Sequence, residues 1–241
     1  MKIIDAYWEK RNLGLACIEI TVEEEDDVQN LRQAIMENHA EYMVIKIPEC
    51  RVELYQELVK QEFYFVESLI SLEKQIRLPV LSEKQNRMLP ELSYQMDEES
   101  GRERVIAQIN LGLFNTDRIS VDPFFSSKDA NNRYVGMLSD ELERGGELME
   151  YLWKGQPIGF TCFRKINDDE YYQSLSGIYF DFRGRGLGFL PSFFPIVEMQ
   201  KRNVKRVITA ISTNNMPSLR VHVRDGFVPT SISNIFVKHW S

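Results

Sequence analysis

The sequence predicts an α/β (α+β) protein made of two units, a smaller one followed by a larger one. Short runs rich in β-branched and aromatic residues alternate with segments of helical periodicity along the 241 residues. An arginine- and glycine-rich turn at residues 183–188 joins an apolar run to a helical pattern. A polar, charged stretch at 81–92, flanked by prolines, is typical of a linker. We therefore place an N-terminal α+β unit at 1–85 and a second unit at 86–241.

The composition is that of an ordinary water-soluble globular protein. Hydrophobic residues make up 43% and charged residues 27%, and no apolar run approaches the roughly 20 residues that cross a membrane. The formal net charge of −7 argues against a nucleic-acid partner. The three cysteines lack metal-ligand spacing, and no long apolar signal segment is present. We expect reduced thiols, no metal, no membrane contact and a cytoplasmic location.

The smaller unit has the pattern of three strands and two helices. Residues 8–14 form a turn-rich opening. Apolar, β-branched runs predict strands at 15–22, 42–47 and 63–72. The acidic run at 23–27 leads into a predicted helix that ends near Asn38, and a second helix is predicted at 52–61.

The larger unit continues the alternation. Its predicted elements are a strand at 92–96, a helix at 97–112, an irregular aromatic loop at 114–125, a helix at 128–144, a hairpin of 147–154 and 158–165, a strand at 171–182, a helix at 187–202, a strand at 204–212, a helix headed by Asn215 and a strand at 231–238. Pro191 is tolerated in a first helical turn, whereas Pro195 should kink or loosen its helix.

The turn between strand and helix has the chemistry of an anion site. Glycines let the main chain approach a ligand, and the first turn of a helix presents free N–H groups and a positive dipole end. Arg183 and Arg185 add donors for phosphate. The turn lacks the pattern of a P-loop and of a dinucleotide-binding loop.

Arg183, Gly186 and Gly188 match the pattern Arg/Gln-x-x-Gly-x-Gly/Ala, which resembles the acetyl-CoA pyrophosphate loop of the GNAT family of N-acetyltransferases. A second GNAT motif, Asn-x-x-Ala-x-x-x-Tyr-x-x-x-Gly-Phe, is matched in register at Asn215, Ser218, His222, Gly226 and Phe227. The resemblance covers residues 92–240. It implies the GNAT fold, a mixed central sheet flanked by helices.

The same resemblance implies acetyl-CoA as cosubstrate and direct acetyl transfer to a primary amine. The pyrophosphate would be held by main-chain N–H groups of Arg183, Gly184, Arg185, Gly186, Leu187, Gly188 and Phe189. The main chain of Ile178 and Phe180 would pair with the pantetheine arm like an added strand, and the Phe180 N–H would hold the thioester oxygen. Asn215 would contact CoA, cap its helix, or do both.

A narrower resemblance is to the bacterial dTDP-fucosamine acetyltransferases, which carry a smaller N-terminal domain. It rests on Trp8-Glu…Asn12-Leu-Gly14, Phe63…Val66-Glu67, Phe114…Asp117-Arg118 and Gly159. It implies that the acceptor is the amino group of a dTDP-linked amino-deoxy sugar. Arg118 could meet a nucleotide phosphate, and Phe124 or Phe125 could stack on a base or cover the sugar. Alternatively, these side chains pack the loop onto the core. A homodimer stays open.

His222 stands where the GNAT family usually has Tyr, the proton donor to the departing thiolate. Histidine can also donate to sulfur, and its unperturbed pKa of about 6.5 suits that role. Alternatively, it is a buried histidine in an enzyme without a dedicated acid. Glu67 matches a glutamate of the narrower group and is the predicted base, or is an ordinary strand carboxylate. Glu147, Glu150 and Asp181 are further base candidates.

Two other functions fit the same motifs. One is a GNAT enzyme that acetylates another small amine or a peptide N-terminus. The other is a non-catalytic CoA-binding GNAT protein, which the change from Tyr to His at residue 222 motivates.

Overall fold

The computed structural model describes residues 1–96 and 99–240. Within them, ten strands form one sheet in the order β1-β2-β3-β10-β4-β9-β8-β7-β6-β5. The strands are β1 Lys2–Asp5, β2 Cys17–Thr21, β3 Tyr42–Pro48, β4 Tyr64–Gln75, β5 Leu92–Met96, β6 Glu147–Trp153, β7 Gln156–Asn167, β8 Glu170–Ile178, β9 Arg206–Ser212 and β10 Val228–His239. The helices are α1 Tyr7–Leu13, α2 Val28–Glu37, α3 Val52–Lys60, α4 Glu83–Met88, α5 Glu99–Asn110, α6 Arg118–Val121, α7 Ser127–Glu143, α8 Leu190–Lys201 and α9 Met216–Arg224. Two 3-10 turns are η1 Leu89–Glu91 and η2 Phe180–Phe182.

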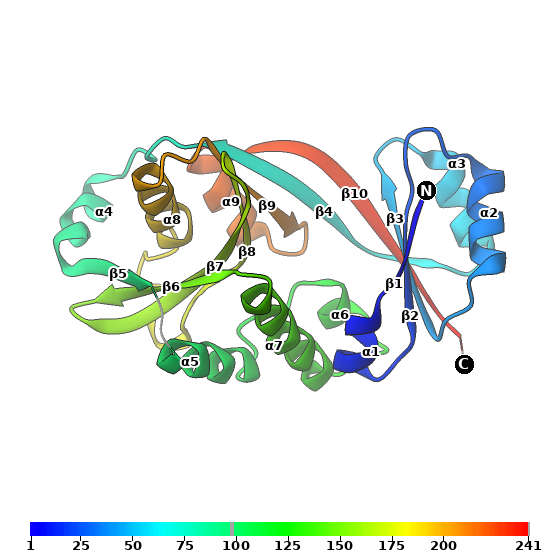
Figure 1. The fold of residues 1–241 in the computed structure, drawn as a ribbon, viewed down its shortest axis with the longest axis horizontal. Coiled ribbons are helices and arrows are strands. Elements are labelled where there is room, and N and C mark those ends of the chain that lie inside the picture. The colour runs from blue at the N-terminus through cyan, green and yellow to red at the C-terminus, as the bar shows by residue number, and fades with distance from the viewer. Residues whose placement is uncertain (97–98, 241) are drawn as a thin grey trace.

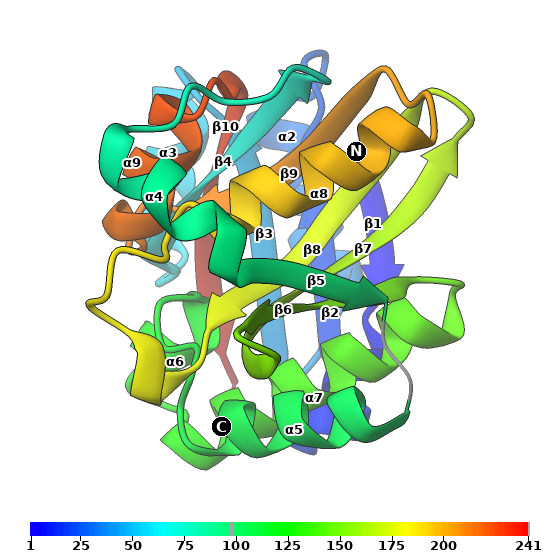
Figure 2. The ribbon, with the colours of Figure 1, turned by 90° about the vertical axis from the view of Figure 1, so that its left-hand side faces the viewer.

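The sheet is mixed, as predicted, with helices on both faces (Figures 1 and 2). The pairs β2–β3 and β8–β9 are parallel and the other neighbours are antiparallel. Side chains alternate between the faces along each strand. In β6, for example, Leu148 joins the core under α5 and α7, whereas Met149 joins the core under α8. The two layers of helices are therefore specified by the period-two pattern of the strands.

Strand β10 joins the two ends of the chain. It pairs antiparallel with β3 on one side and with β4 on the other. Figure 1 shows β4 and β10 as long neighbouring strands that run between the two ends of the molecule. Strands from both predicted units thus share one sheet, and the boundary between 1–85 and 86–241 stays a prediction.

Three short helices are missing from the sequence prediction. Residues 8–14, expected as turns, form most of α1, which ends at Gly14 with a φ of 78°. The expected linker contains α4, whose first turn is capped reciprocally by Ser82 and Gln85. The aromatic loop contains α6, capped by Asp117. None of the described helices is long and apolar enough to cross a membrane.

Several predicted boundaries move for identifiable reasons. Asp27, the last residue of the acidic run, caps α2, so this helix starts at Val28 directly after the run. Strand β8 ends at Ile178, because the chain turns into η2. The predicted helix start at residues 97–98 lies outside the described residues.

Helix α8 continues through Pro195, contrary to the expected disruption. Proline has no N–H, so the carbonyl of Pro191, four residues earlier, loses its donor within the helix. Gln173 of β8 replaces that donor, since its Nε2 donates to Pro191 O at 3.1 Å. The side chain of Gln173 is almost fully buried. A strand side chain therefore completes the helix and ties α8 to β8.

We predict that Gln173→Leu lowers the free energy of unfolding by about 1–3 kcal/mol, because the buried Pro191 carbonyl loses its donor. Pro195→Ala restores an N–H at the right place in the helix, so the cost of Gln173→Leu should be smaller in that background. Urea unfolding of the two single variants and the double variant measures this coupling. Equal costs in both backgrounds would contradict the compensation.

We further predict that a fragment of residues 1–85 does not form a stable monomer. Strands β3 and β4 would each expose the edge that β10 covers in the full chain. Circular dichroism and gel filtration of the fragment should show unfolded or aggregated material, with the full chain as the folded control. A folded monomeric fragment would instead support an independent first domain.

Candidate functional site

The site begins where β8 and β9 stop pairing. Their parallel ladder covers only Glu170–Tyr172 on β8 and Arg206–Ile208 on β9. Beyond it both strands continue, and their residues 173–176 and 209–212 line a cavity of about 220 Å³. Strand β4, helices α7 and α9 and the loop before α6 complete its walls. The separation thus opens a cavity in the middle of the sheet.

A second cavity of about 540 Å³ adjoins the first. The two share lining residues from β8, α9 and the loop after α5, including Ser176, Asn215 and His222. The second cavity reaches Arg183, Gly188 and the first turn of α8. We call it the outer cavity, and the one between the strands the inner cavity. Together they lead from the predicted anion loop to the strand separation.

The loop before α8 has the geometry expected of an anion site. Gly184 and Gly186 have φ values of 75° and 84°, which glycine adopts without strain. No side chain caps α8. Within the described part of the chain, the main-chain N–H groups from Gly184 to Phe189 have no hydrogen-bond acceptor. These amides and the positive end of the helix dipole are therefore free for an anionic ligand.

The arginines of this loop are only partly available. Arg183 Nη2 donates to Leu113 O at 2.8 Å, and its Nε donates to Ile178 O at 3.3 Å. Its guanidinium also stacks on the Phe180 ring, at 4.2 Å from the centroid. This arginine therefore holds the loop in place, which differs from its predicted contact with phosphate. Lys84 of α4 is a further cation beside this loop that the sequence did not indicate. Its Nζ lies close to Gly186, at 3.7 Å from the position that a Cβ atom would take there.

The main-chain groups predicted to pair with the pantetheine arm, at Ile178 and Phe180, have partners within the chain. The Ile178 carbonyl accepts from Arg183, and the Phe180 N–H donates to Gln108 Oε1 at 3.2 Å. Phe180 begins a 3-10 turn and no longer belongs to the strand. Ser176 and Gly177, which line the outer cavity, are the part of β8 that a ligand can reach there.

Helix α9 brings Asn215 and His222 to both cavities. Asn215 caps the helix, since its side chain accepts from Ser218 N at 3.2 Å. His222 Nδ1 lies 2.9 Å from Ser218 O, a carbonyl that can only accept. The proton of the neutral ring is therefore on Nδ1, and the buried Nε2 has a free lone pair and no partner among the described residues. Burial lowers the pKa of His222, which favours the neutral ring. The ring must therefore accept a proton before it can act as an acid.

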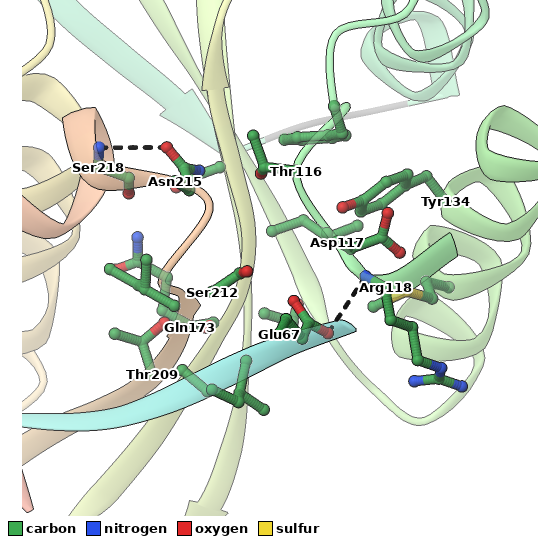
Figure 3. A pocket seen from close by; sticks show the side chains of 18 of the residues that line it. Glu67, Thr116, Asp117, Arg118, Tyr134, Gln173, Thr209, Ser212, Asn215 and Ser218 are labelled. Atoms are coloured by element: carbon green, nitrogen blue, oxygen red, sulfur yellow. Dashed lines mark hydrogen bonds between the residues drawn. The ribbon is translucent and has the colours of Figure 1, made fainter. Parts of the chain in front are cut away.

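Glu67 lies on the wall of the inner cavity (Figure 3). Its Oε1 accepts from the main-chain N–H of Arg118 at 3.2 Å, and its Oε2 has no hydrogen-bond partner in the described chain. Burial raises the pKa of this carboxyl. The other base candidates lie elsewhere: Glu150 is fully buried against Arg104, Glu147 pairs with Arg202, and Asp181 lies in η2.

Arg118 is not free to meet a nucleotide phosphate as predicted. Its guanidinium is buried and forms ion pairs with Glu9 and Glu19. Arg133 pairs with Glu9 and Asp117, and Lys46 pairs with Glu19. We call this set, Glu9, Glu19, Lys46, Asp117, Arg118 and Arg133, the ion cluster. Its three cations are matched by three carboxylates, so Arg118 carries no excess charge for a phosphate.

Phe124 lies outside both cavities. Its ring stacks on His239 with centroids 3.9 Å apart, and His239 Nε2 lies 2.9 Å from Asp122. Phe124 and His239 line a surface hollow with Tyr64 and Lys238, separate from both cavities. Arg118 and Phe124 therefore do not form one acceptor site. Among the described residues, no group of three His, Cys, Asp or Glu is arranged to hold a metal.

The comparisons with known proteins agree with this architecture. A GCN5-related N-acetyltransferase from Sphaerobacter thermophilus superposes with a TM-score of 0.64 over 99% of this chain and 75% of that chain, at 11% identity. One from Kribbella flavida gives 0.56 over 94% and 82%, at 12% identity. A functionally unknown conserved protein from Staphylococcus epidermidis gives 0.63 over 93% and 84%, at 13% identity.

The chain has the GNAT fold. At these identities the likeness concerns the fold alone, and no protein-family model or curated protein matches the sequence. The predicted GNAT fold is confirmed, and the match extends over nearly the whole chain rather than over residues 92–240 only.

The raised pKa of Glu67 predicts a pH dependence of stability within this GNAT fold. The folded protein binds this proton more tightly than the unfolded chain, whose glutamate pKa is about 4.3. The stabilising contribution is therefore full below that pH and is lost as the pH rises through the folded-state pKa. Relative to Glu67→Gln, the wild type should lose stability over this rise. Urea unfolding of both proteins across pH 4–8 tests the prediction, and a difference that stays constant would contradict it.

Proposed function

We propose that the protein is an N-acetyltransferase that transfers the acetyl group of acetyl-CoA directly to a primary amine. One observation carries the proposal: the two cavities connect a loop of free main-chain N–H groups with the separation of β8 and β9. The loop suits the pyrophosphate of CoA, and the outer cavity suits its pantetheine arm. The thioester would then lie at the strand separation, next to the inner cavity.

In this proposal each loop residue has a defined part. The N–H groups of Gly184, Arg185, Gly186, Leu187, Gly188 and Phe189 hold the pyrophosphate. Lys84 and Arg185 add positive charge, while Arg183 keeps the loop in shape. Ser176 and Gly177 offer main-chain groups to the pantetheine amides, taking the role first expected of Ile178 and Phe180. Asn215 keeps α9 in place beside this path.

The transfer from an ammonium ion needs two protons removed from nitrogen, one before the attack and one after it, and one proton supplied to sulfur. The substrate amine arrives mostly as an ammonium ion. Glu67 Oε2 is proposed to accept the first of its protons. The free amine then attacks the thioester carbonyl carbon, a C–N bond forms, and the C–S bond breaks with CoA leaving as thiolate. His222 is the proposed proton donor to the thiolate, but its ring starts neutral and must first be protonated. Its Nε2 first takes a proton released by the amine and then passes it to sulfur.

The geometry supports a primary amine as the acetyl acceptor, but it offers no support for an amine that is linked to a nucleotide. The dTDP-linked amino sugar was expected on Arg118 and Phe124, which lie apart and are otherwise engaged. It therefore stays one candidate among primary amines. A non-catalytic CoA-binding protein is the second candidate function, favoured only by His222 at the usual Tyr position.

We predict that acetyl-CoA raises the melting temperature of the protein. At 100 times its dissociation constant, a ligand specific for the folded state stabilises it by about 2.7 kcal/mol. Added dTDP should cause no further rise, because the inner cavity offers it no free cation. Release of free CoA on addition of amines separates an enzyme from a non-catalytic binder. No shift with acetyl-CoA would refute the proposed function.

We also predict that Gly186→Ala weakens acetyl-CoA binding about five-fold or more. The φ of 84° costs an alanine about 1 kcal/mol, so the loop leaves the geometry that gathers its N–H groups. Gly145→Ala is the matched control, since Gly145 has the same φ of 84° but lies at the end of α7. Isothermal titration of acetyl-CoA into both variants measures the two affinities. Equal affinities would show that the loop does not hold the cofactor.

A further inference from the structure

We infer that the acceptor of this enzyme is a compact amine that binds as a cation and carries no anionic group, with Glu67 as its ionic partner. This inference rests on the proposed function, because it names the substrate class of the same site. Three independent features of the inner cavity support it: a charge balance, the chemistry of its unpartnered atoms, and its size.

Of the charged side chains on the wall of the inner cavity, Glu67 is the one without an ion pair among the described residues. In the ion cluster, each of Lys46, Arg118 and Arg133 contacts a carboxylate, and each of Glu9, Glu19 and Asp117 contacts a cation. Glu67 lies beside this cluster and is a fourth carboxylate. Within the described residues it has no ion pair, although it is only 5% exposed. A buried carboxylate without a cation is costly, so a cationic ligand at Oε2 would complete the set.

The unpartnered atoms on the cavity wall are mostly acceptors. Glu67 Oε2, Gln173 Oε1 and His222 Nε2 are buried, have no partner within the described chain, and can each accept a hydrogen bond. Arg118 Nε is the one unpartnered donor among them. A protonated amine offers three N–H donors, whereas a carboxylate or phosphate offers none. The wall therefore matches a ligand rich in donors.

An anionic group on the ligand would meet an unfavourable environment. Both arginines on the wall are already paired, and Glu67 adds a negative charge. Bringing a phosphate or carboxylate here places like charges close together in a buried site. The volume of about 220 Å³ also lies below the roughly 300–1,000 Å³ of sites for drug-sized ligands. Both features favour a small cation over an amine linked to a diphosphate.

Matched pairs of amines test the inference. Glucosamine differs from glucosamine 6-phosphate, and propylamine from β-alanine, by one anionic group. Thermal shifts with each amine alone, without acetyl-CoA, report binding independently of catalysis. Glucosamine, propylamine or both should raise the melting temperature at tens of millimolar, and their anionic counterparts should not. With acetyl-CoA, CoA release should be at least ten-fold faster for the amine that binds than for its anionic counterpart.

Glu67→Gln tests the assigned partner. It removes the charge with little change in shape, and the affinity for the preferred amine should fall about ten- to hundred-fold, as for a lost charged hydrogen bond. Glu73→Gln is the control, because Glu73 lies on the same strand outside both cavities. Circular dichroism confirms that each variant is folded.

The outcomes separate the two proposals. Failure of acetyl-CoA to bind refutes the proposed function. The thermal shifts with amines alone still test whether the inner cavity binds a cationic amine. The inference is overturned if the anionic amine of a pair binds as well as its partner, or if none of the amines shifts the melting temperature. It is also overturned if Glu67→Gln binds the preferred amine as tightly as Glu73→Gln does.

Discussion

Parallel strands β8 and β9 share a ladder only at their first residues, and their separation constrains everything around it. Main-chain groups beyond the ladder lose their natural partners, and buried groups of this kind need others. One is satisfied internally, since Thr209 Oγ1 donates to the Gln173 carbonyl at 2.9 Å. The remaining space is occupied by the two cavities, where a ligand with its own amides can take the place of a strand. The helix that brings the anion loop is tied to the same point through Gln173 and Pro191.

The ion cluster forms the other half of the site. Burying these charges costs desolvation energy, so the cluster is better understood as a device that specifies geometry than as a source of stability. It links Glu9 of α1 and Glu19 of β2 with Arg118 of α6 and Arg133 of α7. Carboxylates from the first twenty residues thereby hold Arg118 and Arg133, which line the inner cavity together with residues of the C-terminal half. The acceptor side of the site is consequently shared between parts of the chain that lie far apart in sequence.

The sequence was sufficient for the GNAT fold, because the fold depends on local patterns. Period-two alternation, β-branched runs and the positive-φ glycines at 184 and 186 are readable without tertiary contacts. The contacts of Arg118 and Phe124 could not be foreseen, because the partners of these side chains come from distant segments, here α1 and the end of β10. The replacement of a missing helix donor by Gln173 was equally invisible, since it depends on which strand residue faces α8. The caps at Ser82 and Asp117 were present in the sequence as short-helix signals and were overlooked.

The place of β10 in the sheet has a consequence for biosynthesis. Strand β3 leaves the ribosome roughly 180 residues before β10, which at about 5–20 residues per second is a delay on the order of ten seconds or more. Throughout that delay the β3 and β4 edges lack the strand that finally lies between them. The nascent chain must therefore postpone closing its sheet, and this pair of open edges is where a chaperone would give the greatest protection against mispairing.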